Sequence, residues 1–141
     1  MPAIGVSVQG VDNLLELLKG LDEDVRGEVV QDGLLAGAQI VAADAAARAP
    51  RETGALAESI RAEKRDVEPG ESVAVGIKAA WYWRFPEFGV KPHELGRKRG
   101  YKVHMGHGAQ PFARPAVDEN VERVLEATAD AIRGALEARA R

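Results

Sequence analysis

Apolar residues recur at helical spacing in three stretches of the chain. The first stretch runs from Val11 to Leu21, the second from about Asp22 or Asp24 to Arg48, and the third from about Arg114 onward. Spacings of three and four place these residues on one face of each stretch, which predicts three amphipathic helices. The expected core positions are Val11, Leu14, Leu15, Leu18 and Leu21, then Val25, Val29, Leu34, Ala38, Val41 and Ala45, then Val117, Val121, Val124, Thr128, Ile132 and Leu136.

The second helix is rich in alanine, carries three glycines and stops before a proline. Gly27, Gly33 and Gly37 each weaken it by up to ~1 kcal/mol, so a kink is one expectation. Pro50 is expected to end it, because the residue before a proline avoids the helical region. Thr53-Gly54 then suits a turn in which Thr53 can cap the next helical turn and Gly54 tolerates an unusual backbone angle.

An alternating pattern replaces the helical one in two places. Residues 4–8 read as a short half-buried strand, because Ile4, Val6 and Val8 alternate with small or polar residues. Residues 59–79 read as a hairpin around a turn at 68–71. The first half of this hairpin is very polar, so we expect a solvated face or a sheet edge.

The aromatic residues gather just after this hairpin. The stretch 81–85 favours either a strand or a single helical turn, and Glu87-Phe88-Gly89 suggests a strand end with a buried Phe88. Phe112 lies between two prolines and is expected to pack as an apolar staple at the start of the last helix. No period is visible from Val90 to Ala109, so we expect a mobile basic loop there.

Composition narrows the class of protein. The chain has 141 residues, enough for one domain, and carries a net charge of -3, which gives no global argument for nucleic acid or a membrane surface. It has no cysteine, and its start lacks the pattern of a secretory signal. No apolar run approaches the ~20 residues of a membrane span. We therefore expect synthesis in a reducing cytoplasm and no contact with membranes.

Candidate chemistry is sparse. His93, His104 and His107 lack the cysteines or further histidines that would complete a tetrahedral zinc site, and no serine sits in a nucleophile-elbow context. We predict no catalytic, cofactor-binding or metal-binding residues and no cofactor. The one local cluster of charge is the basic loop, whose cations Lys91, Arg97, Lys98, Arg99 and Lys102 suit docking on an acidic partner, contact with DNA, or simple solvation.

Three short segments, taken in order, resemble the phage neck proteins of the tail-component family typified by gene product ten of a lambdoid siphophage. The first is Ala-x-x-Pro-x-x-Thr-Gly-x-Leu at the end of the long helix, the second an aromatic stretch ending in Glu-Phe-Gly, and the third Pro-Phe-x-x-Pro-Ala at the start of the last helix. The family positions are Pro50, Thr53, Gly54, Leu56, Tyr82, Glu87, Phe88, Gly89, Pro111, Phe112 and Pro115.

The resemblance implies an α+β fold, in which a long alanine-rich N-terminal helix and a C-terminal helix pack on a small, mainly antiparallel sheet of three or four strands. It implies a single domain over residues 1–141 and a structural virion protein that joins the capsid to a long tail, without catalysis. Its partners would be copies of itself, in a ring of about six, together with head-connector and tail proteins and passing genomic DNA. The alternative is a small nucleic-acid-binding or regulatory protein that uses residues 91–102.

Overall fold

The computed structural model describes residues 11–65, 74–96 and 103–139, and six helices and four strands lie in these ranges. The helices are α1 (Val11–Lys19), α2 (Glu23–Arg48), α3 (Ala55–Ser59), α4 (Arg84–Phe88), α5 (Ala113–Asp118) and α6 (Val121–Arg139). The strands are β1 (Arg61–Arg65), β2 (Ala74–Lys78), β3 (His93–Glu94) and β4 (Val103–His104). The strand expected at residues 4–8 and the turn expected at 68–71 lie outside the described residues.

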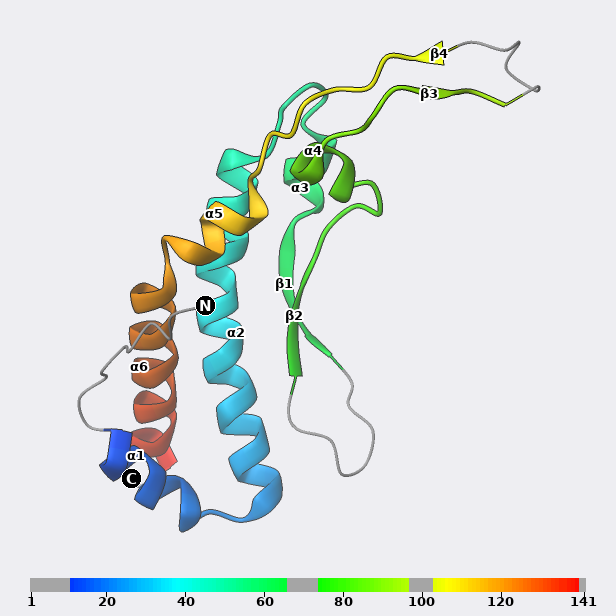
Figure 1. Ribbon diagram of the computed structural model, residues 1–141. Coiled ribbons are helices and arrows are strands. Elements are labelled where there is room, and N and C mark those ends of the chain that lie inside the picture. Colours follow the sequence, from blue (N-terminus) through cyan, green and yellow to red (C-terminus); the bar gives the residue numbers. More distant parts are fainter. Residues whose placement is uncertain (1–10, 66–73, 97–102, 140–141) are drawn as a thin grey trace.

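Helix α2 is the central element of the fold. It has α6 on one side and the β1–β2 hairpin on the other (Figure 1). It ends at Arg48, and Ala49 adopts an extended conformation before Pro50, as the sequence predicted. The helix runs unbroken through Gly27, Gly33 and Gly37, so these glycines do not interrupt it.

Two of these glycines let α6 approach α2 closely. A Cβ atom built on Gly37 would lie 2.5 Å from Oγ1 of Thr128, and one on Gly33 would lie 2.6 Å from Cγ1 of Ile132. Any side chain at these positions would therefore overlap α6. The glycines lower the helix propensity of α2, but they provide the space that α6 occupies.

The core consists of two clusters placed along α2. The upper cluster contains Val41, Ala42, Ala45, Ala49, Leu56, Ile60, Phe112 and Ala116, and the lower cluster contains Val29, Ile132 and Leu136. Leu14, Leu18 and Leu21 pack against the lower cluster, as their spacing predicted. Leu15 and Leu34 were also expected in the core, but their exposed fractions are 47% and 37%.

The predicted C-terminal helix is two helices, separated by Glu119 and Asn120. Asn120 is buried, and its side-chain amide donates to the carbonyl of Ala116 at 2.8 Å and to Oδ2 of Asp44 at 2.6 Å. An asparagine side chain that bonds the backbone in this way competes with the helical ladder, which accounts for the break. The break also explains why Val117, expected in the core stripe of one continuous helix, is 50% exposed.

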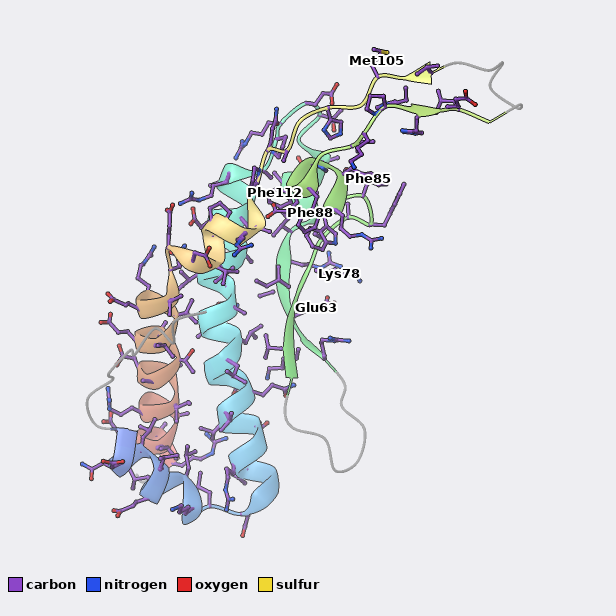
Figure 2. All side chains as sticks on the ribbon, in the orientation of Figure 1. Glu63, Lys78, Phe85, Phe88, Met105 and Phe112 are labelled. Atoms are coloured by element: carbon purple, nitrogen blue, oxygen red, sulfur yellow. The ribbon has the colours of Figure 1, made fainter. Side chains whose placement is uncertain are left out.

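The strands form two separate antiparallel pairs in the described residues. In the first pair Arg61 lies opposite Lys78, and Ala62 packs toward the upper core. Glu63, on the opposite face, pairs with both Arg61 and Lys78. Figure 2 labels Glu63 and Lys78 on the two strands. The hairpin with a solvated face is therefore confirmed. The α+β fold is confirmed as well, although its strands divide into two ribbons and α6 packs on α2.

Candidate functional site

The first and third of the short segments meet in the upper core. Phe112 is 1% exposed and lies in one cluster with Ala49 and Leu56, which come from the end of α2 and from α3. The prediction that Phe112 packs as an apolar anchor at the start of the last helical region is confirmed. Its position fixes where α5 begins against α2.

The second segment is joined to the third by one buried carboxylate. Glu87 is 5% exposed, and its Oε2 accepts hydrogen bonds from the backbone N–H groups of Phe112 at 2.8 Å and Ala113 at 2.9 Å. Its Oε1 accepts a third, from the N–H of Arg114, at 3.1 Å. These N–H groups open α5 and have no partner within the helix, so Glu87 caps that helix from a distant part of the chain.

The same contacts set the acidity of Glu87. Burial alone would raise the pKa of this carboxyl, but the three backbone N–H groups, together with the charge of Arg114, bring its pKa below the ordinary value. The group is therefore held as a carboxylate, which is the form that can accept all three hydrogen bonds.

The expected burial of Phe88 is wrong, and Glu87 is the inward residue. Phe88 is 71% exposed. The reason is that residues 84–88 form helix α4, so the single helical turn is the alternative that the structure adopts for the aromatic stretch. A helical turn directs neighbouring side chains about 100° apart, which carries Glu87 inward and Phe88 outward.

Gly89 completes the junction through a close approach of two backbones. Its φ angle is 76°, in the left-handed region, and a Cβ atom there would lie 2.9 Å from the backbone nitrogen of Ala109. The neighbouring N–H of Gln110 donates to the carbonyl of Pro86 at 2.7 Å. Only glycine can adopt this φ angle without strain and also leave room for the backbone of Ala109. Gly89 therefore fixes the point at which the chain leaves the helical part of the fold.

The segment that was expected to be a structureless loop leaves this point as a paired ribbon. Val90 and His107 exchange two backbone hydrogen bonds of 2.9 Å, and β3 pairs with β4 beyond them. The rings of His93 and His104 stack across the ribbon with centroids 5.1 Å apart. We call residues 90–107 the arm, and its described part projects away from the helices (Figures 1 and 2).

The cations proposed for this region are only partly described. Lys91 is exposed at the base of the arm. Arg97, Lys98, Arg99 and Lys102 lie outside the described residues. Whether the arm is mobile, and whether it meets a protein partner or DNA, remain expectations from the sequence.

Exposed aromatic side chains lie beside the base of the arm. Trp81 is 78% exposed, Phe88 is 71% exposed and Phe85 is 47% exposed. The rings of Trp81 and Phe85 pack edge to face with centroids 5.9 Å apart, and Phe88 packs against Trp83. We call Trp81, Phe85 and Phe88 the aromatic shelf. Tyr82, by contrast, is half-buried and packs against the upper core.

The first segment forms the expected turn, although the N-cap of helix α3 is Gly54 and not Thr53. The N–H of Ala55 donates to Oγ1 of Thr53 at 3.3 Å, and Gly54 has a φ angle of 78° before helix α3.

The prolines of the predicted site lie near the same end of α2. Pro50 and Pro86 line a shallow pocket together with residues 107–110. Pro111 is exposed and Pro115 half-buried, next to and within α5. The predicted site residues that the structure describes therefore lie mainly around one junction, at the end of α2 nearest the arm.

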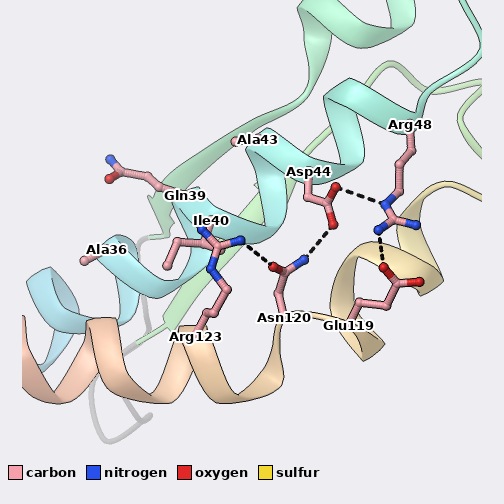
Figure 3. Close-up of a pocket in the computed structure, with 9 residues that line it drawn as sticks. All are labelled: Ala36, Gln39, Ile40, Ala43, Asp44, Arg48, Glu119, Asn120 and Arg123. Atoms are coloured by element: carbon pink, nitrogen blue, oxygen red, sulfur yellow. Dashed lines mark hydrogen bonds and ion pairs between the residues drawn. The ribbon is translucent and has the colours of Figure 1, made fainter.

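A wider groove opens between α2 and the α5–α6 break (Figure 3). It measures about 700 Å³, and its polar side chains bond mainly to one another. Arg48 donates to Asp44 at 3.0 Å and also pairs with Glu119, while Arg123 donates to Asn120 at 3.0 Å. Hydrogen bonds from Arg48 and then from Asn120 lower the pKa of Asp44, and the same pairing raises the pKa of Arg48. These bonds join α2 to the break between the last two helices, which the sequence pattern did not reveal.

Two structural features are absent from the part of the chain that the structure describes. No group of three or more histidine, aspartate or glutamate side chains is placed to hold a metal ion within 11–65, 74–96 and 103–139. In the same ranges no helix combines the length and the apolar character that crossing a membrane requires.

Comparison with known proteins gives one match. No curated protein and no solved structure matches the chain. Residues 12–89 match the family described as "Bacteriophage HK97-gp10, putative tail-component", and this range covers more than half of the 141 residues. It includes the first two of the short segments and ends at Gly89, where the arm begins. The chain therefore belongs to the HK97-gp10-like family of phage tail components and is a structural virion protein.

Proposed function

We propose that this chain is a subunit of the joint between capsid and tail. Several copies, about six by the resemblance of its motifs, would form a ring through which the genomic DNA passes. The ring would bind head-connector proteins on one side and tail proteins on the other. It would act through matched surfaces alone, without catalysis or a cofactor.

The junction around Glu87 is the observation that best supports this role. Three segments of the chain are joined there by a buried carboxylate and by close backbone contacts, and the result is a fixed base for a projecting arm. A rigid base with an exposed arm and an aromatic shelf suits a protein that fits against others. The ionisable groups of the groove are largely engaged with one another, so they too suit a structural role.

Removal of the gene tests the proposal. Particles assembled without this chain should yield filled heads and separate, completed tails when viewed by electron microscopy. A gold-labelled copy, supplied in trans, should restore joined particles and place the label at the neck. Joined particles that contain no copy of the chain would contradict the proposal.

The arm supports the alternative of DNA binding, because residues 90–109 contain five lysines and arginines and one glutamate. Binding through phosphate contacts weakens steeply as salt rises. A titration of duplex DNA at low and at high salt therefore distinguishes the two functions. The connector proposal expects weak, sequence-independent binding at most, whereas a regulatory protein would bind one sequence tightly at high salt.

A further inference from the structure

The two ends of the molecule carry exposed apolar side chains with opposite charge around them. At the arm end these are the residues of the aromatic shelf, and Arg84 and Lys91 are exposed nearby. Within the described residues neither of these two cations forms an ion pair. The arm end is therefore an apolar surface beside two cations that form no ion pair in this part of the chain, and Glu94 is an exposed carboxylate on the described part of the arm.

The opposite end is formed by α1 and the first turns of α2. On α1, Leu15 is 47% exposed and Leu17 is 57% exposed, and Asp12 and Glu16 are exposed beside them. Residues 12–32 contain seven carboxylates and only two cations. One of these cations, Arg26, donates to the backbone carbonyls of Leu18 and Leu21. Two of the carboxylates are already paired, Glu28 with Arg139 and Asp32 with Lys64, whereas Asp12 and Glu16 on α1 form no ion pair within the described residues. We call residues 12–32 the acidic foot.

The shelf and the foot cannot meet within one chain. Helix α1 lies at one end of α2, and α4 with the arm lies at the other (Figure 1). Any contact between the two surfaces must therefore join two molecules. In the sequence, residues 90–109 carry a net charge of +4, while the whole chain carries -3.

We propose that the aromatic shelf of one copy packs on Leu15 and Leu17 of a second copy, with the cations of the arm end facing the acidic foot. Such a contact joins two different surfaces, so it repeats from copy to copy and can close into a ring. Aromatic anchors supply most of the affinity in such contacts, and complementary charge sets their orientation and rate. The inference rests on the proposed function, since it names the surfaces through which the subunits of the ring would meet.

Cross-linking of mixed single-cysteine chains tests the contact directly, because the natural chain has no cysteine. One chain carries Leu17→Cys and the other Phe88→Cys, and both positions are exposed. After oxidation of the mixture we expect a disulfide-linked dimer that contains one chain of each kind. The matched control replaces the foot variant with Glu122→Cys, an exposed position on the first turn of α6, and should give little dimer.

Charge reversal gives a second, independent test. Glu16→Lys or Arg84→Glu alone should weaken self-association about tenfold, measured by sedimentation at low salt. The two changes together should restore it, because opposite charges again face each other. High salt should reduce the difference between the variants.

Three results would overturn the inference. A chain that stays monomeric at every concentration would do so, as would dimers linked mainly through like positions, Leu17→Cys to Leu17→Cys or Phe88→Cys to Phe88→Cys. The inference would also be overturned if Phe88→Cys gave as much mixed dimer with the Glu122→Cys control as with Leu17→Cys. None of these results removes the chain from the neck of the particle, which electron microscopy of labelled particles decides separately.

Discussion

The carboxylate of Glu87 accepts a 2.8 Å hydrogen bond from the backbone N–H of Phe112, 25 residues further along the chain. This contact holds the start of α5 against α4 and fixes the two ends of the arm relative to each other.

Replacement of Glu87 should therefore destabilise the whole fold. Glu87→Gln removes the charge and one of the two acceptor oxygens, and we expect the free energy of unfolding to fall by about 1–3 kcal/mol. Urea denaturation followed by circular dichroism measures the change. Glu126→Gln, at an exposed position of α6, is the control and should change stability by less than about 0.5 kcal/mol. Equal stability of the two variants would contradict the role assigned to the cap.

Stability should also fall in acid, and part of this fall should come from Glu87. Its pKa in the folded chain is below the ordinary value, so the unfolded chain takes up the proton first as the pH falls. The contribution is fully present above the ordinary glutamate pKa, about 4.3, and is lost as the pH falls through the folded pKa. Between about pH 6 and pH 3 the Glu87→Gln variant should lose less stability than the natural chain. If the free energy of unfolding fell equally with pH in the natural chain and in Glu87→Gln, Glu87 would not be the source of this acid sensitivity.

Alanine should have opposite effects at different glycines of the long helices. Gly37→Ala and Gly33→Ala place a methyl group against α6 and should lower the free energy of unfolding by about 1–3 kcal/mol. Gly134→Ala is the matched control, because a Cβ atom at Gly134 meets nothing within 4 Å. It should raise stability by up to about 1 kcal/mol through helix propensity alone. Stabilisation at all three sites would show that α2 and α6 do not pack as closely as described.

Asn120 should be far more sensitive than the other asparagine of the chain. Asn120→Ala leaves the carbonyl of Ala116 without its buried donor, and we expect a loss of about 1–3 kcal/mol in thermal or urea unfolding. Asn13→Ala changes an exposed position on α1 and should have little effect. If the two variants unfold alike, the hydrogen bonds at the α5–α6 break carry little stability.

The elements with strong local signals could be predicted from the sequence. The long helix and its end before Pro50, the turn at Thr53 and Gly54, and the buried Phe112 all follow from the spacing of apolar residues and from the chemistry of proline and glycine. The polar hairpin follows from its alternation. Each of these features has a signal in adjacent residues of the sequence, even where, as at Phe112, the packing partners lie far away along the chain.

The features that the sequence pattern did not predict depend on residues far apart in the chain. Burial of Glu87 is decided by N–H groups 25 residues away, and nothing in Glu-Phe-Gly distinguishes the inward residue from the outward one. The break at Asn120 requires Asp44 as a partner, 76 residues earlier. The packing role of Gly33 and Gly37 is visible only when α6 lies against them. The arm shows no apolar alternation because its described residues are largely exposed on both faces.

The base of the arm has a consequence for how proteins of this kind change over generations. Its anchoring comes from Gly89, Glu87 and backbone groups near Ala109, and none of the described side chains at 91–96 and 103–106 takes part in those bonds. Insertions and substitutions farther along the ribbon would thus leave the helical scaffold intact. Related proteins can therefore differ in the arm, and so in the partner that it contacts, while they keep the same helical scaffold.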